Sequence, residues 1–218
     1  ASDNTAVGLN SLLSNTTGTQ NTAVGSAALD ANTSATGNTA FGYSSLSANT
    51  TGDRNVAIGW SAMSVNTVGD RATALGYAAL QNQNPSSNTD TYNVAIGYNA
   101  GNAITTGTLN TALGALALDA ATTASENTAV GYGALTICTT GGANTAIGYV
   151  ALQNLTTGVA NTAVGNQSMV YTTTGGYNVA VGRESLDANT TGGSNTAIGY
   201  NTLGANTTAD NNTAVGSN

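Results

Sequence analysis

Aromatic side chains recur at a regular spacing in this chain, and they are its clearest candidates for binding. Seven of the eleven aromatic residues are separated by 17 residues, by multiples of 17, or in one case by 21: Tyr43, Trp60, Tyr77, Tyr98, Tyr132, Tyr149 and Tyr200. Flat amphipathic rings on a rigid surface can stack on sugars or on a partner protein at a low cost in entropy. They can equally stack on one another to cover a bend or seal a seam between chains. The series predicts either an adhesive surface or an inter-chain aromatic ladder.

Eight asparagines lie in Asn-x-Ser/Thr sequences, which accept glycans in secreted proteins. They are Asn15, Asn32, Asn49, Asn154, Asn166, Asn189, Asn206 and Asn211. The same sequences would arise if an Asn-Thr-Thr turn were repeated many times, because Asn favours turns through its local hydrogen bonds. Both interpretations stay open at this point.

Charged residues are too few and too scattered for the common catalytic, metal and nucleic-acid sites. The 218 residues include ten acids, three Arg and no Lys or His, for a formal net charge of −7. Without His, and with Cys138 as the only cysteine, the usual metal and nucleophile constellations cannot be assembled. Three Arg form no patch that could neutralise phosphates, and no apolar run approaches the roughly 20 residues of a membrane span. We expect no enzyme activity, no cofactor, no metal site, no nucleic-acid partner and no membrane insertion.

An internal repeat underlies the spacing of the aromatic residues. A motif of the form Asn-Thr-Ala-aliphatic-Gly occurs thirteen times, starting at Asn4, Asn21, Asn38, Asn55, Ala72, Asn93, Asn110, Asn127, Asn144, Asn161, Asn178, Asn195 and Asn212. Eleven of the twelve intervals are 17 residues, and the interval from Ala72 to Asn93 is 21. The extra four residues fall in segment 81–92, which holds the only proline, Pro85, and is expected to form a loop.

Several places of the repeat, counted from its Asn, hold nearly constant residue types. The third place is always Ala, the fourth is always large and apolar, and the fifth is always Gly. The ninth place is Leu or Met except at Gly101, and the thirteenth is Thr wherever the spacing is 17. The aromatic series occupies the sixth place. A repeat with two apolar ranks and regular glycines suits strands and bends better than helices.

These features predict an all-β fold, a parallel β-solenoid of about 13 rungs spanning residues 1–218 as a single domain. Each 17-residue unit would form one coil with two short strands, which pair with their copies in the neighbouring rungs at about 4.8 Å. The resulting rod would be roughly 60 Å long. Glycine at the fifth place would supply the freedom for a sharp bend.

The third and fourth places must point to opposite faces of a strand. We interpret the aliphatic rank as the filling of a thin core, and the Ala rank as the face that packs against another chain. The alternative is that Ala occupies a tight corner, where it touches solvent or a neighbouring loop.

The segments NTAVGSAAL, NVAIGWSAM, NTAIGYVAL and NTAIGYNTL resemble the head repeats of trimeric autotransporter adhesins and the NTAVG-type repeats of tail-fibre-like surface proteins. The resemblance extends from Asn4 to Gly216. It implies a left-handed parallel β-roll in which three chains form a fibre that attaches to surfaces. It also implies an extracellular location, on a cell surface or a virion tail fibre, with host-surface glycans or proteins as partners.

The sequence thus predicts an extracellular structural or adhesive fibre, with a homotrimer as its expected assembly. An alternative is a self-polymerising filament joined head to tail, because the motif runs to both ends without an atypical capping unit. A weaker alternative is an ice-binding protein, since Thr recurs at the thirteenth and fourteenth places. The twelfth place, expected to share an outer face with the fourteenth, varies too much to complete a plane of hydroxyl groups.

Overall fold

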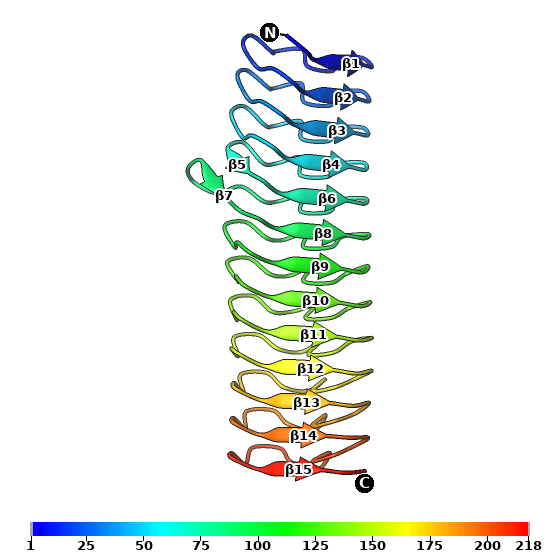
Figure 1. The fold of residues 1–218 in the computed structure, drawn as a ribbon, viewed down its shortest axis with the longest axis vertical. Coiled ribbons are helices and arrows are strands. Elements are labelled where there is room, and N and C mark those ends of the chain that lie inside the picture. Colours follow the sequence, from blue (N-terminus) through cyan, green and yellow to red (C-terminus); the bar gives the residue numbers. More distant parts are fainter. Residues whose placement is uncertain (1, 218) are drawn as a thin grey trace.

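The chain folds into one continuous rod of stacked coils, as the repeat predicts (Figure 1). The computed structural model describes residues 2–217, which contain strands and turns but no helix. The thirteen strands of the main sheet are β1 (Thr5–Val7), β2 (Thr22–Val24), β3 (Thr39–Phe41), β4 (Val56–Ile58), β6 (Thr73–Leu75), β8 (Val94–Ile96), β9 (Thr111–Leu113), β10 (Thr128–Val130), β11 (Thr145–Ile147), β12 (Thr162–Val164), β13 (Val179–Val181), β14 (Thr196–Ile198) and β15 (Thr213–Val215). Two further strands, β5 (Gly69–Asp70) and β7 (Thr89–Asp90), form a separate pair. The parallel β-solenoid is confirmed.

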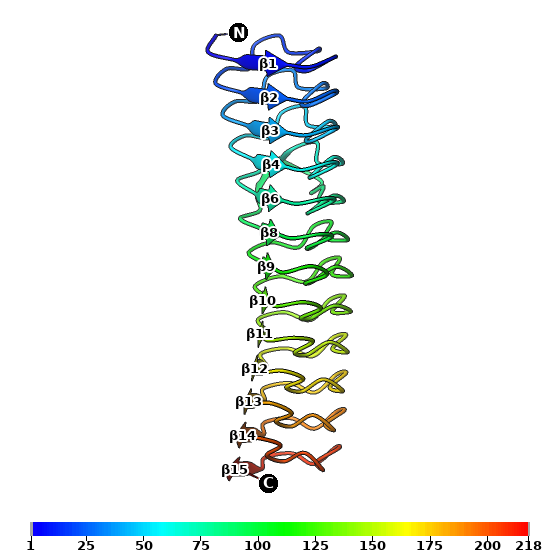
Figure 2. The same cartoon turned by 90° about the vertical axis from the view of Figure 1, so that its right-hand side faces the viewer.

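Each strand of the main sheet pairs in parallel with the equivalent strand of the next rung. The register joins equal places of the repeat, so that Ala6 pairs with Ala23 and Ala129 with Ala146. The strands turn gradually about the long axis from β1 to β15 (Figure 2). Equivalent side chains therefore lie above one another along a gently twisted rod.

Outside the two rungs that hold β5 and β7, each rung forms only one regular strand, so the prediction of two strands in every rung was wrong. The rest of the coil consists of turns and bends whose backbone is nonetheless bonded from rung to rung. For example, the amide of Leu46 donates to the carbonyl oxygen of Ala62 over 3.0 Å. The seventh, ninth and seventeenth places have positive φ in rung after rung, as at Leu46, where φ is 50°. Such left-handed residues bend the chain sharply and prevent a second extended strand.

The Ala rank lines the core, and the aliphatic rank faces outward, which is the reverse of our interpretation. Ala40 and its equivalents in β2 to β14 are buried, whereas Phe41 and Ile147 at the fourth place are 56% and 40% exposed. The alternative position for Ala, in a corner that touches solvent, is wrong for the same reason. The ninth-place leucines and methionines from Leu29 to Leu186, such as Leu46, are fully buried and fill the coil from its opposite wall.

The thickness of the coil explains this arrangement. A Cβ built on Gly101, at the ninth place, would lie only 3.7 Å from the Cβ of Ala95, at the third place of the same rung. The leucines of the other rungs project from that ninth place, so the strand opposite has room for no more than a methyl group. The larger fourth-place side chain must therefore point away from the core.

Buried asparagines fasten the rungs together at the first place. The amide of Asn38 donates to Oδ1 of Asn21 over 2.9 Å, and Nδ2 of Asn38 donates to the carbonyl oxygen of Gly52 over 2.9 Å. The same pattern recurs down the rod, including at Asn144 and Asn161. These side chains satisfy backbone groups that the short strands leave unpaired.

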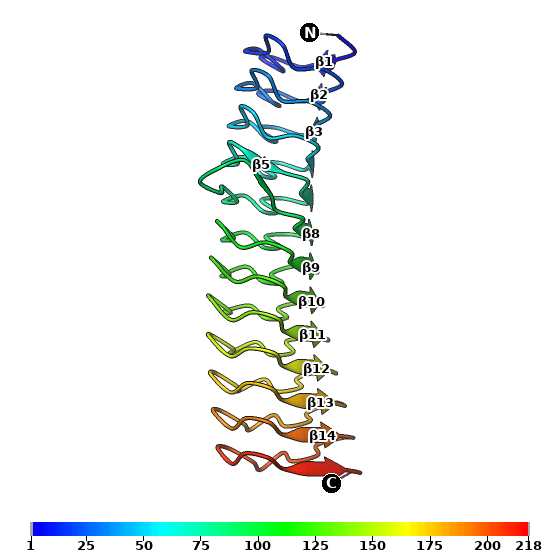
Figure 3. The same ribbon diagram turned by 60° about the vertical axis from the view of Figure 1, so that its left-hand side comes forward.

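The four-residue insertion forms a loop that projects from the side of the rod between β5 and β7 (Figure 1 and Figure 3). Asp70 of β5 pairs with Asp90 of β7, and the guanidinium of Arg71 forms an ion pair with Asp90. The rungs on either side stay in register, since β6 pairs directly with β8. The insertion therefore leaves the main sheet continuous.

Candidate interaction surface

Exposed apolar side chains run along the rod in two ranks, the fourth-place side chains and the sixth-place aromatic rings, on either side of the fifth-place glycine bend. The residues that are more than one third exposed at the fourth place are Val7, Phe41, Leu75, Leu113, Ile147, Val181, Ile198 and Val215. All seven members of the aromatic series are between 44% and 56% exposed. We call this surface the exposed strip. Sequence analysis found its aromatic half and misplaced its aliphatic half in the core.

The aromatic rings of the exposed strip contact one another along the rod. Tyr43, Trp60, Tyr77 and Tyr98 form a continuous series, with ring centroids 5.3 to 6.0 Å apart. Tyr132 and Tyr149 form a separate stacked pair at 5.6 Å, with planes inclined by 13°. Within this chain the rings thus stack in two pieces, interrupted at Ala115.

Tyr200, the last member of the series, has a charged neighbour instead of another ring. The guanidinium carbon of Arg183 lies 5.7 Å from its ring centroid, which is within the range of a cation–π contact. Arg183 also donates to Glu184 over 2.7 Å. The positive charge is therefore compensated locally.

The ring geometry favours contact through the edges and hydroxyl groups. In the stacked pairs Tyr77–Tyr98 and Tyr132–Tyr149, each ring lies against the next along the rod, so its face is turned toward a neighbouring rung. Stacking on a sugar requires a ring face that is open to solvent. The stacked tyrosines are therefore better suited to a protein surface than to a sugar ring.

A rank of threonine hydroxyl groups borders the aliphatic side chains, and sequence analysis did not single it out. The second place holds Thr in ten of the thirteen motifs. Like the fourth place, it points outward from the sheet. Within residues 2–217 none of these ten hydroxyl groups has a hydrogen-bond partner. These hydroxyl groups remain available to water or to a partner. In the sequence they look like the thirteenth-place threonines, and the one signal that could have separated the two ranks is that second-place side chains point outward from the strand.

The thirteenth-place threonines use their hydroxyl groups within the rod. Oγ1 of Thr105 donates to the carbonyl oxygen of Thr122 over 3.0 Å, and equivalent bonds recur at Thr156 and Thr173. The twelfth place, expected to share the outer face with the exposed fourteenth, instead points into the core at Asn49 and Leu155. The two outer hydroxyl ranks of an ice-binding face do not form here.

The eight predicted glycosylation sequences fall into three environments. Asn32, Asn49 and Asn189 are fully buried, and their Nδ2 atoms donate within the rod. The side chains of Asn15, Asn154 and Asn206 are half-buried and also donate to carbonyl oxygens. Only Asn166 and Asn211 are exposed. A glycan fits the folded rod at these two, whereas the buried three belong to the turn repeat.

The acidic residues and the cysteine form no reactive cluster. Within residues 2–217, no group of three or more His, Cys, Asp or Glu side chains is placed to hold a metal ion. Burial raises the pKa of the Cys138 thiol to about 11, so it stays protonated near neutral pH. Burial is also the main cause that raises the pKa of Asp70, and the nearby charge of Asp53 adds to it.

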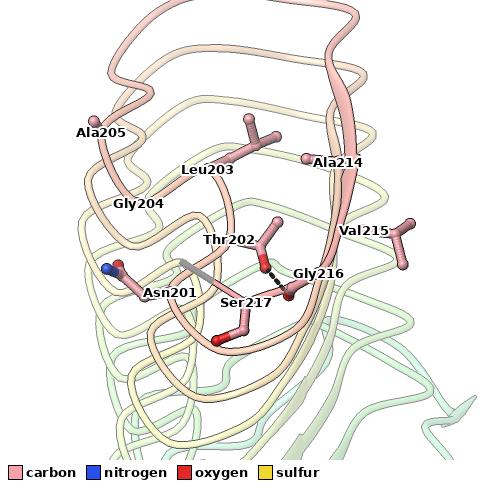
Figure 4. A pocket seen from close by; sticks show the side chains of 9 residues that line it. All are labelled: Asn201, Thr202, Leu203, Gly204, Ala205, Ala214, Val215, Gly216 and Ser217. Atoms are coloured by element: carbon pink, nitrogen blue, oxygen red, sulfur yellow. Dashed lines mark hydrogen bonds between the residues drawn. The ribbon is translucent and has the colours of Figure 1, made fainter.

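A hollow of about 510 Å³ lies beside β15. Its lining includes Leu203, Ala214 and Val215 (Figure 4). Thr202 donates to the carbonyl oxygen of Gly216 across it over 2.7 Å. In preceding rungs the equivalent surface is covered by the next coil. No charged side chain lines this hollow.

Comparison with known protein families, curated proteins and solved structures found no match. The resemblance to adhesin and tail-fibre repeats therefore stays a prediction. The part of the chain that the structure describes contains no helix long and apolar enough to cross a membrane.

Proposed function

We propose that this protein is the shaft of an extracellular structural or adhesive fibre, in which three copies assemble side by side. The exposed strip carries this proposal. Large exposed apolar surfaces mark interaction sites, and the exposed strip recurs along the length of a regular rod. The resemblance to trimeric surface repeats supplies the expected number of chains.

The rest of the molecule supports a mechanical role over a chemical one. Adjacent rungs are bonded through the sheet and the turn backbone, and all along the rod except after Ala72 the first-place asparagines add side-chain bonds. In such a stack stability comes from contacts between adjacent repeats, so length can be built by repetition. A rod of this kind holds whatever it displays at a fixed distance from its anchor.

Sedimentation equilibrium on the purified chain at several micromolar concentrations tests the proposal. We expect a single mass of three chains, and electron micrographs that show short rods of uniform length. Polymers with a broad length distribution would instead support the head-to-tail filament. A soluble monomer throughout that range would contradict both assemblies.

A further inference from the structure

We propose that the exposed strip is the surface through which copies of this chain pack against one another. This inference rests on the proposed fibre function and specifies the face that forms the contact. The sequence analysis assigned the contact between chains to the Ala rank, but the core encloses these residues. The fourth- and sixth-place side chains take that role instead. The occupant of the strip is a second copy of the same chain.

The strip is large enough for a stable interface. An aromatic side chain offers about 150–250 Å² of contact area, and seven of them are roughly half exposed. Together they offer on the order of 700 Å², close to the roughly 800 Å² per partner of a standard protein interface. The exposed fourth-place side chains add to this area.

The distribution of charge favours this face over the others. A chain with a net charge of −7 repels its own copies unless the approaching surfaces lack carboxylates. No Asp or Glu occupies the second, fourth or sixth place of any repeat. The one charge among these places, Arg183, is paired with Glu184. Acidic side chains gather elsewhere, as at Asp119 in the tenth place and Asp53 in the sixteenth.

The regularity of the strip suits a partner with the same regularity. Equivalent side chains repeat at the spacing of the parallel sheet, about 4.8 Å, and a copy related by rotation about an axis along the rod presents the same ranks at the same heights. Within residues 2–217 the hydroxyl groups of the second-place threonines and of the six sixth-place tyrosines are without hydrogen-bond partners. They can pair across the contact, so its polar groups need not be buried unsatisfied.

A pair of matched variants tests this assignment. Ile147→Glu combined with Tyr149→Glu places two carboxylates on the exposed strip in one rung. Thr140→Glu combined with Thr157→Glu places two on the exposed fourteenth-place rank as the control. We expect the strip variant to dissociate at least tenfold more readily in sedimentation equilibrium, while the control keeps the assembly of the unmodified chain. Circular dichroism establishes that both remain folded.

A milder variant covers the case in which the double Glu variant fails to fold. Tyr132→Asn combined with Tyr149→Asn uses a residue that the chain already holds at the sixth place, Asn166. This variant removes two exposed rings without adding charge or disturbing the core. We expect it to weaken association, because the lost rings belong to the contact.

The outcomes separate this inference from the proposed function. If the unmodified chain is monomeric, the fibre proposal and this inference fall together. If it assembles and the folded strip variants assemble equally well, the fibre stands and the assignment of the face is wrong. Thermal hysteresis that is lost in a strip variant of unchanged mass would assign the face to ice and overturn the inference.

Discussion

The fifth-place glycine sets how closely successive rungs can approach. At Gly42 φ is +132°, and an added Cβ would lie 2.6 Å from the carbonyl oxygen of Gly59 in the next rung. Gly37 also has a positive φ, of +73°, but an added Cβ there would meet only the Arg54 side chain at 3.7 Å. Both glycines thus have a positive φ, but only at Gly42 would an added Cβ clash with the backbone of the next rung.

Gly42→Ala should lower the free energy of unfolding by about 3 kcal/mol, since strain and a backbone clash combine. Gly37→Ala is the matched control and should change it by about 1 kcal/mol, because other residues adopt positive φ at the seventeenth place. Denaturant titrations followed by circular dichroism measure both. Equal losses would mean that the clash with Gly59 is unimportant.

A local exchange of core residues compensates for the missing leucine at Gly101. Ile104, at the twelfth place, is fully buried, and its Cδ1 would lie 3.0 Å from a Cβ on Gly101. The isoleucine therefore occupies space that a ninth-place leucine fills in other rungs. The sequence showed the exception, but it could not show which side chain fills the gap.

Ile104→Ala should cost about 2–4 kcal/mol through the cavity it leaves. Gly101→Leu should also destabilise the chain, because the added side chain meets Ile104. Combined, the two substitutions should recover most of the loss, with a coupling energy of about 1–3 kcal/mol in a double-mutant cycle. Purely additive effects in thermal melts would show that the two side chains do not compete for one space.

At the scale of elements, the sequence specified the rung but left its inner face undetermined. The 17-residue period, the invariant Ala and Gly and the leucine rank suffice to predict a parallel solenoid. Alternation along a strand states only that Ala129 and Val130 face opposite ways. Which of the two faces the core depends on the depth of the coil, which is set by Leu135 on the opposite wall. A pattern of neighbouring residues along one strand does not contain that depth.

The turns were less predictable than the strand for a related reason. Leucines such as Leu118 and Leu152 adopt positive φ, which is unfavourable for a residue with a large side chain. Their full burial offsets this local cost. The local preference of leucine for an extended backbone predicts a second strand, but burial of its side chain in the core favours the left-handed turn. The second strand therefore does not form in these rungs. The same turns bury the twelfth place and with it three of the glycosylation sequences.

The inserted loop is an addition to the rod and should be removable. Deleting residues 86–89 with Asp90→Gly restores the 17-residue spacing and the small residue that the fifteenth place holds elsewhere. The ion pair of Arg71 with Asp90 is lost, but exposed pairs contribute about 1 kcal/mol or less. Circular dichroism should retain its β-structure signal. Its loss would show that the loop is needed for folding.

At the scale of the whole molecule, stability should increase as the solution becomes acidic. Burial raises the folded-state pKa of Asp70, Asp119 and Asp187 above the ordinary value of an aspartate. For a raised pKa, the stabilising contribution is complete below the unfolded value and is lost as pH rises through the folded value. The melting temperature should therefore rise as pH falls from neutrality toward about 3.

The variant Asp119→Asn isolates one contribution to this pH dependence. Oδ1 of Asp119 is buried, burial is the main cause that raises the pKa of this carboxyl, and Asn102 occupies the same place in the preceding rung. The substitution should raise the melting temperature at pH 7 and reduce the gain on acidification. Melting curves at pH 7 and at about pH 3 measure both effects. A lower melting temperature of the variant at pH 7 would show that the buried Asp119 carboxylate is not a cause of the pH dependence.

The rod as a whole should tolerate the loss of a complete rung but not of a partial one. Deleting residues 127–143 joins Glu126 to Asn144, so a seventeenth place is again followed by a first place. β9 can then pair with β11 in the register that it now makes with β10, since Thr111 and Thr145 occupy equal places. Each interior rung contacts mainly its two neighbours, so one interface disappears and the remainder persist.

We expect this shortened chain to stay folded, with a rod about 4.8 Å shorter by small-angle scattering. Deleting only residues 127–135 is the control, because the nine-residue loss sets Ala against the wrong place of the repeat and moves apolar side chains to the wrong face. That control should lose cooperative melting. If both deletions melted alike, the stability of the rod would not depend on rung-to-rung register.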